Sequence, residues 1–342
     1  MEPGAKLIAD FRETFARIQD QIARVVVGHR DVVEQILVAF FCGGHVLIEG
    51  VPGTGKTLIA RSLGEAVNLS FSRIQFTVDL MPADVTGTRM ILDRDDGRRE
   101  LVFVEGPIFS HVLLADEINR ATPKTQSSLL EAMAELQVTV AGTTYRLQPP
   151  FFVVATLNPI EMEGTYPLPE AQLDRFFFKV RLPFPSPADM KQILESTTRA
   201  EFPQIEPVFS RDEAPVRVEE MKRLVREVLV APHLQDYAAT IVHASQPVAA
   251  GGGSPAGFVR DELVTKYVSF GSSPRGGQAL ILAAKVYALL SGRSNITPDD
   301  VDRAAAPALN HRLVLNFAAE ADRVDPREIV ARVLRSVQKL RR

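Results

Sequence analysis

The chain of 342 residues carries 39 Lys and Arg against 42 Asp and Glu, a formal net charge of −3, and 46% of its residues are hydrophobic. This composition excludes a disordered chain, and the length allows about two domains. The nearly balanced charge excludes a general attraction to nucleic acid or anionic lipid, so such a contact would need a local basic patch.

The sequence also argues against export, membrane insertion and disulfide chemistry. Its first residues, "MEPGAKLIADFRETFARI", place acids and bases among the apolar residues, and no apolar run reaches the ~18 residues of a membrane span. The one cysteine, Cys42, lies in the stretch "VAFFCGG", which favours a small buried thiol over a nucleophile. We therefore expect a cytoplasmic protein.

Strands and helices alternate along the first half of the chain. An entry helix is predicted over 5–26, where apolar residues recur at helical spacing. The strands beyond it are nearly unbroken apolar runs, and such alternation predicts a parallel sheet with helices on both faces. We expect strands at 45–50, 71–77, 111–117, 151–158 and 176–182, and helices at 56–66 and 124–136.

Two insertions and a Pro-rich segment organise the rest of the chain. Residues 89–106 carry an Asp-Gly turn and residues 136–150 an Ala-Gly-Thr-Thr turn, and both predict β-hairpins. The segment "RLPFPSPADM" ends the α/β region near residue 185. We therefore expect an α/β nucleotide-binding domain over 1–185 and a helical domain over 186–342, with helices at 187–200, 217–229, 231–245, 275–291, 298–310 and 326–340.

The stretch "GVPGTGKT" lies between a predicted strand and a predicted helix, as a phosphate-binding loop requires. Its glycines permit a turn that points backbone N–H groups at phosphate oxygens, and the helix offers the same anion its positive end. Lys56 would meet the β and γ phosphates, and Thr57 would place its hydroxyl on Mg²⁺. The flanking elements disfavour a chance Gly-rich turn. The expected nucleotide-binding residues here are Gly50, Pro52, Gly53, Thr54, Gly55, Lys56, Thr57 and Leu58.

The stretch "HVLLADEIN" delivers two adjacent carboxylates to the carboxyl edge of the sheet, beside this loop. Asp116 would hold Mg²⁺ through the water shell of the ion, and Glu117 would orient and polarise the attacking water. The plainer alternative is an acid pair that caps the next helix.

Four motifs in order resemble those of the MoxR family of AAA+ ATPases. They are "GVPGTGKT", "LLADEINRATPKTQSSLLEAMAE", "VVATLNPIEMEGTYPLPEAQLDRF" and "GSSPRG", and the resemblance covers roughly residues 20 to 310. It implies an α/β fold whose phosphate-loop sheet is sandwiched by helices, the AAA+ core, followed by an all-α lid domain. It also implies ATP and ADP as ligands, Mg²⁺ as cofactor, and a ring of identical subunits, expected to be a hexamer.

The resemblance gives three polar residues a role in hydrolysis. Asn158 corresponds to sensor 1, which positions water or the γ-phosphate. Arg175 corresponds to the arginine finger, which acts on the nucleotide of a neighbouring subunit, and Arg275 to sensor 2, with action in its own subunit or in the neighbour left open. Without the motifs, Arg175 would be a surface ion pair. Arg275 would be a cation paired with a nearby acid.

The resemblance also implies functions for the segment before the phosphate loop and for the two hairpins. In "VVVGHRDVVEQI", Val27 and Gly28 would lie against the adenine, and His29 stands where the family commonly has Gln. The two hairpins correspond to the inserts of the helix-2-insert branch and would project toward the pore or one face of the ring. Asn119 and Arg120 are expected at the subunit interface.

The resulting hypothesis is a ring ATPase that acts as a chaperone-like remodeller or activator of partner proteins, often ones with a von Willebrand factor A domain. Two alternatives stay open. A metal-chelatase motor subunit would need a partner subunit and different inserts. A nucleic-acid motor would need a pore hairpin rich in Lys and Arg, which the 136–150 hairpin, with only Arg146, does not offer. In the other hairpin the charges nearly cancel, between Arg94, Arg98 and Arg99 and Asp93, Asp95, Asp96 and Glu100.

Overall fold

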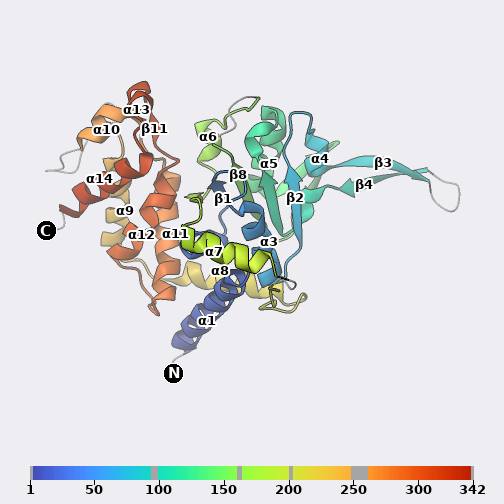
Figure 1. Ribbon diagram of the computed structural model, residues 1–342, viewed down its shortest axis with the longest axis horizontal. Coiled ribbons are helices and arrows are strands. Elements are labelled where there is room, and N and C mark those ends of the chain that lie inside the picture. The colour runs from blue at the N-terminus through green and yellow to red at the C-terminus, as the bar shows by residue number, and fades with distance from the viewer. Residues whose placement is uncertain (1–2, 94–98, 160–163, 200–202, 248–260, 340–342) are drawn as a thin grey trace.

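A parallel five-stranded sheet forms the centre of the part of the chain that the computed structural model describes, residues 3–93, 99–159, 164–199, 203–247 and 261–339. The strand order is β2-β5-β8-β1-β9, with helices on both faces (Figure 1). All the predicted strands are confirmed, each within a few residues. They are β1 Val46–Glu49, β2 Phe71–Gln75, β5 Val112–Asp116, β8 Phe152–Leu157 and β9 Phe178–Arg181.

Neighbouring residues of each strand point to opposite faces of the sheet, and each face has its own core. In β1, Val46 and Ile48 pack with the side of α1, α2 and α3, whereas Leu47 packs with the side of α4 and α5. Because both faces are covered, the inner strands β1, β5 and β8 are mostly apolar. The helices of this region are α1 Pro3–Ala23, α2 Arg30–Cys42, α3 Lys56–Val67, α4 Pro82–Thr86, α5 Pro123–Glu135 and α6 Glu170–Leu173, with 3-10 turns at Pro107–Phe109 and Ile118–Arg120.

Helix α2, which the sequence did not predict as an element, contacts both the central sheet and the C-terminal helices. It packs against α1, β9, α8 and α11, and its residues from Ile36 to Cys42 are all buried. A helix covered on all sides lacks the polar stripe that makes helical spacing visible. Although α2 is strongly apolar, no helix of the described residues is long and apolar enough to cross a membrane.

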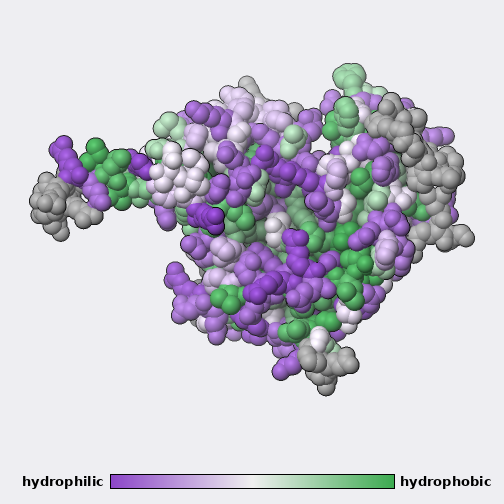
Figure 2. Space-filling model, turned by 180° about the vertical axis from the view of Figure 1, so that it is seen from behind, coloured by the Kyte–Doolittle hydropathy of each residue, from purple (hydrophilic) through white to green (hydrophobic). Residues whose placement is uncertain are grey.

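Both predicted hairpins are confirmed. Strands β3 (Gly87–Asp93) and β4 (Arg99–Glu105) form an antiparallel arm that extends away from the body (Figure 1), and β6 (Gln137–Val140) pairs with β7 (Thr143–Arg146). Figure 2 shows hydrophobic side chains along the arm. The tip residues Arg94, Asp95, Asp96 and Arg98 lie outside the described residues, and the exposed apolar residues of the arm are Met90, Ile91, Leu101 and Val104.

The C-terminal part is helical, as predicted, with one small antiparallel sheet of β10 and β11 in addition. Several helices begin at a proline, which fits the first turn because no N–H is needed there. This explains why α8 begins three residues before its predicted start, next to Pro215. The elements are α7 Pro187–Thr197, α8 Ala214–Glu227, α9 Pro232–Ala244, α10 Glu262–Tyr267, β10 Val268–Phe270, α11 Pro274–Leu290, α12 Pro298–Leu309, β11 Val314–Leu315, α13 Phe317–Ala321 and α14 Pro326–Lys339.

The helical part, called the lid below, packs directly on the N-terminal helices. Helix α11 contacts α1 and α2, and α8 contacts α2. One hydrophobic cluster contains buried residues of β1, α2, α8, α11 and α12. The domain boundary near residue 185 stays a prediction, and the packing continues across it.

Candidate functional site

The predicted phosphate loop connects β1 to α3 at the carboxyl edge of the sheet. Gly53 and Gly55 have φ angles of +78° and +93°, and a Cβ atom on either would meet nothing within 4 Å, so this bend favours glycine and leaves space beside it. Lys56 begins α3 and is only 8% exposed. Its Nζ donates hydrogen bonds to the carbonyls of Gly50 and Leu157, so its cation lies over the loop.

Asp116 ends β5 next to this loop and is 6% exposed. Its Oδ2 accepts a hydrogen bond from the Thr57 hydroxyl at 3.3 Å, and its Oδ1 accepts one from the Thr156 hydroxyl at 2.7 Å. Arg73 of β2 donates to Oδ2 through Nε at 3.1 Å and Nη2 at 2.8 Å. This buried carboxylate is therefore held by three side chains from three elements, α3, β8 and β2.

Glu117 has a φ angle of +56°, in the left-handed region, which is strained for a residue with a side chain. Its N–H donates to the Thr156 hydroxyl at 2.8 Å. Its Oε2 accepts hydrogen bonds from Gln75 at 2.8 Å and from Arg120 at 3.0 Å. The Glu117 carboxylate therefore lies against Gln75 at the end of β2 and against Arg120.

Asn158 follows the last residue of β8 and is 4% exposed. Its neighbour Leu157 accepts a hydrogen bond from the Gly50 N–H at 3.3 Å. The end of β8 therefore lies against the phosphate loop, in the same group as Lys56 and Asp116.

The two predicted arginines lie elsewhere. Arg175 precedes β9, and Phe178 of β9 is paired with Val46 at the amino end of β1. The Nη1 atom of Arg275, at the start of α11, is 3.8 Å from Oδ2 of Asp174. Both arginines line one hollow between core and lid. The length of β1, about 13 Å, separates them from the phosphate loop of the same chain.

Comparison with known proteins places this geometry in a family. Residues 45–178 match the family model for ATPases associated with various cellular activities, and residues 260–333 match that for AAA lid domains. The chain is 40% identical to Chaperone MoxR1 of Mycobacterium tuberculosis, over 98% of this chain and 84% of the relative. It is 31% identical to Protein MoxR of Methylorubrum extorquens, over 98% and 97%.

The chain belongs to the MoxR family of AAA+ ATPases. A solved structure of a Cytophaga hutchinsonii protein, whose assignment as an ATPase is provisional, superposes with a TM-score of 0.86 at 36% identity. The match covers 97% of this chain and 96% of that one. The AAA+ core and the helical lid that the resemblance implied are thereby confirmed.

The residues of this MoxR-family chain fit a nucleotide and a magnesium ion. The open loop offers backbone N–H groups at the start of α3, where a helix favours an anion. The Thr57 hydroxyl and the Asp116 carboxylate lie together and are hard oxygen ligands of the kind that Mg²⁺ takes. The assignment of these side chains to ATP and Mg²⁺ stays a proposal.

The predicted adenine-side segment lies beside the lid. Gly28 has a φ angle of +87°, and a Cβ atom there would lie 2.8 Å from Cγ of Asp189 in α7. Burial lowers the pKa of His29 from its ordinary value, and Asp189 opposes that shift. Contact of Val27 and Gly28 with a base stays a prediction, as does contact of Pro52 and Leu58 with nucleotide.

Sequence reasoning missed Arg73, Gln75 and Thr156, which hold the acid pair. The available signal was the alternation in β2, where Arg73 and Gln75 flank the buried Ile74. Side chains two residues apart in a strand point to the same face of the sheet, so Arg73 and Gln75 lie on one face. The information that was missing is the pairing of β2 with β5, which sets Gln75 opposite Asp116.

Proposed function

We propose that this MoxR-family ATPase hydrolyses ATP with Mg²⁺ at sites that two neighbouring subunits of a ring share, in a hexamer. The separation of two half-sites carries the proposal: the phosphate loop and acid pair occupy the carboxyl edge, and Arg175 and Arg275 the amino edge. A chain with the two halves at opposite ends of one strand completes a site by placing its amino edge against the carboxyl edge of another copy.

At the carboxyl edge, the loop and Lys56 bind the phosphates, and Thr57 and Asp116 hold the metal. Bound Mg²⁺ neutralises charge on the phosphate oxygens. Glu117 orients the attacking water and accepts its proton, and Asn158 fixes the position of that water or of the γ-phosphate. Glu117 can take this part once its carboxylate leaves Gln75 and Arg120, both of which now bind it.

At the amino edge, Arg175 reaches the γ-phosphate of the neighbour, and Arg275 reports the state of the same nucleotide. A planar cation that crosses an interface stabilises the charge of the transition state and makes hydrolysis depend on assembly. The position of Arg275 favours action on the neighbour over action on its own nucleotide, which the sequence left open.

The free energy of ATP hydrolysis is used to remodel partner proteins. The described part of the β3–β4 arm exposes the apolar side chains of Met90, Ile91, Leu101 and Val104, which suits contact with protein. One relative is named as a chaperone, which agrees with a remodelling role. Partners that carry a von Willebrand factor A domain belong to the same proposal.

Two substitutions at the carboxyl edge test the site. Lys56→Ala removes charge-assisted hydrogen bonds worth about 1.5–3 kcal/mol, so ATP affinity should fall by roughly ten- to a hundred-fold. Glu117→Gln should bind ATP and fail to hydrolyse it. Fluorescent-nucleotide titration and phosphate release measure the two defects, and Lys339→Ala, in the last turn of α14, is the control. Wild-type ATP affinity in Lys56→Ala would remove Lys56 from the site.

A further inference from the structure

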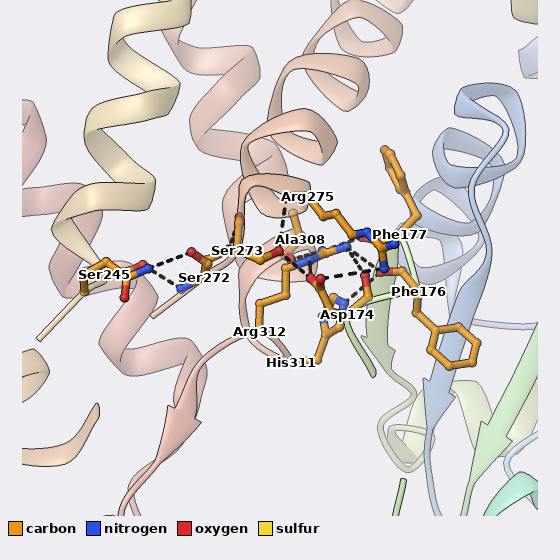
Figure 3. Close-up of polar contacts among 11 residues, drawn as sticks. Asp174, Phe176, Phe177, Ser245, Ser272, Ser273, Arg275, Ala308, His311 and Arg312 are labelled. Atoms are coloured by element: carbon orange, nitrogen blue, oxygen red, sulfur yellow. Dashed lines mark hydrogen bonds and ion pairs between the residues drawn. The ribbon is translucent and has the colours of Figure 1, made fainter. Parts of the chain in front are cut away.

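The buried guanidinium of Arg312 uses all five of its N–H donors. Its side chain is only 3% exposed. Nε donates to Oδ1 of Asp174 at 2.8 Å, Nη1 to the carbonyls of Phe177 and Ala308, and Nη2 to the carbonyls of Asp174 and Phe176 (Figure 3). Four of the five bonds therefore join the lid to the turn of residues 174–177.

This turn carries Arg175. Nη2 of Arg312 binds the carbonyl before Arg175, at 3.2 Å, and the carbonyl after it, at 2.7 Å. The side chain of Arg175 in turn donates to the carbonyl of Leu130 at 2.6 Å. The direction in which Arg175 leaves the backbone is thus set by a side chain of the lid.

Asp174 connects the same turn to the start of α11. Its Oδ1 accepts a hydrogen bond from the Ser273 hydroxyl at 2.8 Å, and Ser273 also accepts one from the Arg275 N–H as the N-cap of α11. Gly276 allows this close approach, because a Cβ atom there would lie 2.8 Å from Leu309 and 3.3 Å from Cδ of Arg312. One carboxylate therefore links Arg312, Arg275 and the turn that holds Arg175.

Further hydrogen bonds join the residues after α12 to strand β9 and to the turn before it. Strand β9 is at the edge of the sheet, so its outer carbonyls need partners. The two residues before Arg312 bind this strand and the turn that precedes it: Asn310 donates to the carbonyl of Lys179 in β9 at 2.9 Å, and Nε2 of His311 donates to the carbonyl of Phe176 in the turn at 3.0 Å. Movement of the end of α12 would therefore move the turn with it.

We propose that Arg312, acting with Asp174, is a positioning residue for hydrolysis in the neighbouring subunit, since it sets the turn of Arg175 according to the position of the lid. The inference rests on the proposed function, because it needs Arg175 to act across the interface. It assigns to the lid a second route to the neighbouring nucleotide, separate from direct contact by Arg275.

Arg312→Lys is the test substitution because it keeps the charge and loses the planar fork. An ammonium group has three donors on one atom and cannot serve the five acceptors of Arg312. We expect hydrolysis to fall by roughly 10²-fold, the cost of a small misplacement of a reacting group. ATP affinity should stay at the wild-type value, because the carboxyl edge is untouched. Arg293→Lys is the matched control, because Arg293 is also a lid arginine and forms a bidentate pair with Asp300. The Arg293→Lys protein should hydrolyse ATP at the wild-type rate.

Mixing subunits distinguishes positioning from general damage. Arg312→Lys subunits keep Glu117 and lack a well-placed Arg175, so Glu117→Gln subunits, whose turn is intact, should restore part of the turnover. Arg175→Ala subunits should restore none, because both defects then lie at the same edge.

Two results would overturn the inference: wild-type hydrolysis in Arg312→Lys, or a loss that Glu117→Gln subunits do not relieve although they relieve Arg175→Ala. If Arg175→Ala itself is not relieved, the proposed function fails instead. Thermal melting and ring assembly are measured first. If Arg312→Lys does not fold, Asp174→Asn replaces it, because this change removes the shared charge at nearly constant shape. The same mixing experiment is then carried out, and the same two results would overturn the inference.

Discussion

The two edges of the central sheet differ in how their charged groups are held. At the carboxyl edge, Asp116 and Glu117 are bound by side chains of β2, β8 and the turn after β5, all within the core. At the amino edge, Arg175 is held by a turn that Arg312 of the lid binds, and Arg275 is about half exposed. The groups of the carboxyl edge are held within the core, whereas those of the amino edge depend on where the lid sits.

This difference suggests that the carboxyl edge serves binding and the amino edge serves turnover in the neighbouring subunit. A site that binds phosphate and metal benefits from a fixed arrangement, because reorganisation during the reaction costs free energy. An arginine that acts on the nucleotide of a neighbouring subunit benefits from being held by the lid, because the lid can change its position as one unit. Removing a phosphate- or metal-binding group from the carboxyl edge should therefore change binding, whereas removing an arginine from the amino edge should change turnover with little change in ATP affinity.

The largest expected effect at the amino edge is that of Arg175→Ala. Hydrolysis should fall by roughly 10³-fold, as for other arginine fingers, with little change in ATP affinity. In the wild type, turnover per subunit should rise with protein concentration as rings assemble. Steady-state phosphate release over a dilution series measures both. Turnover that is independent of concentration down to the monomer would mean that one chain contains a complete site.

Acid should weaken the amino edge through His45, at the start of β1. Its Nδ1 accepts a hydrogen bond from the Val153 N–H, and burial lowers its pKa to about 4. An unfolded histidine titrates near 6.5, so below that pH the unfolded chain binds more protons and stability falls as the pH drops toward 4. The loss from this group should be at most about 3 kcal/mol.

Urea denaturation at pH 7.5 and pH 5 checks this expectation. His45→Gln, which cannot titrate, should lose less stability between the two pH values than the wild type. His311 is also buried with a lowered pKa, so the variant keeps part of the slope. An unchanged slope in His45→Gln would show that His45 does not titrate on unfolding.

The smallest effect is expected from Arg73→Ala at the carboxyl edge. Arg73 is about half exposed and shares Asp116 with any bound cation, so its removal should strengthen metal binding by an amount typical of exposed pairs, about 0.5–1 kcal/mol. The Mg²⁺ concentration for half-maximal binding of a fluorescent ATP analogue should fall roughly two- to five-fold. Arg61→Ala, which removes an exposed pair with Glu65 on α3, is the control. A higher Mg²⁺ requirement in Arg73→Ala would mean that Arg73 supports the metal site.

The two edges also differ in how much of each could be predicted from the sequence. The phosphate loop and Asp116 with Glu117 are contiguous stretches whose chemistry depends on local geometry, so the motifs alone were enough to predict them as site residues. Arg73 becomes a partner of Asp116 only because β2 pairs with β5, and chain order does not give that pairing. Arg312 lies 138 residues from Asp174 and has no motif of its own, so its role depends on how the lid packs on the core.

The same limit applies to the fold. The alternation of strands and helices predicted the parallel sheet, and the turn residues predicted both hairpins. Helix α2 was missed because its second half, from Ile36 to Cys42, is buried on every side and carries no polar stripe, and α10 and α13 were missed because each is only one or two turns long.

The central claim, that each site combines the carboxyl edge of one subunit with the amino edge of the next, is tested most directly by mixing two inactive variants. Arg175→Ala subunits keep Glu117, and Glu117→Gln subunits keep Arg175, so the two types together contain interfaces with both groups intact. If the sites are shared, ATP hydrolysis reappears on mixing, with a maximum at an intermediate ratio. Mixed rings that are shown to form and yet stay inactive at every ratio would contradict the claim.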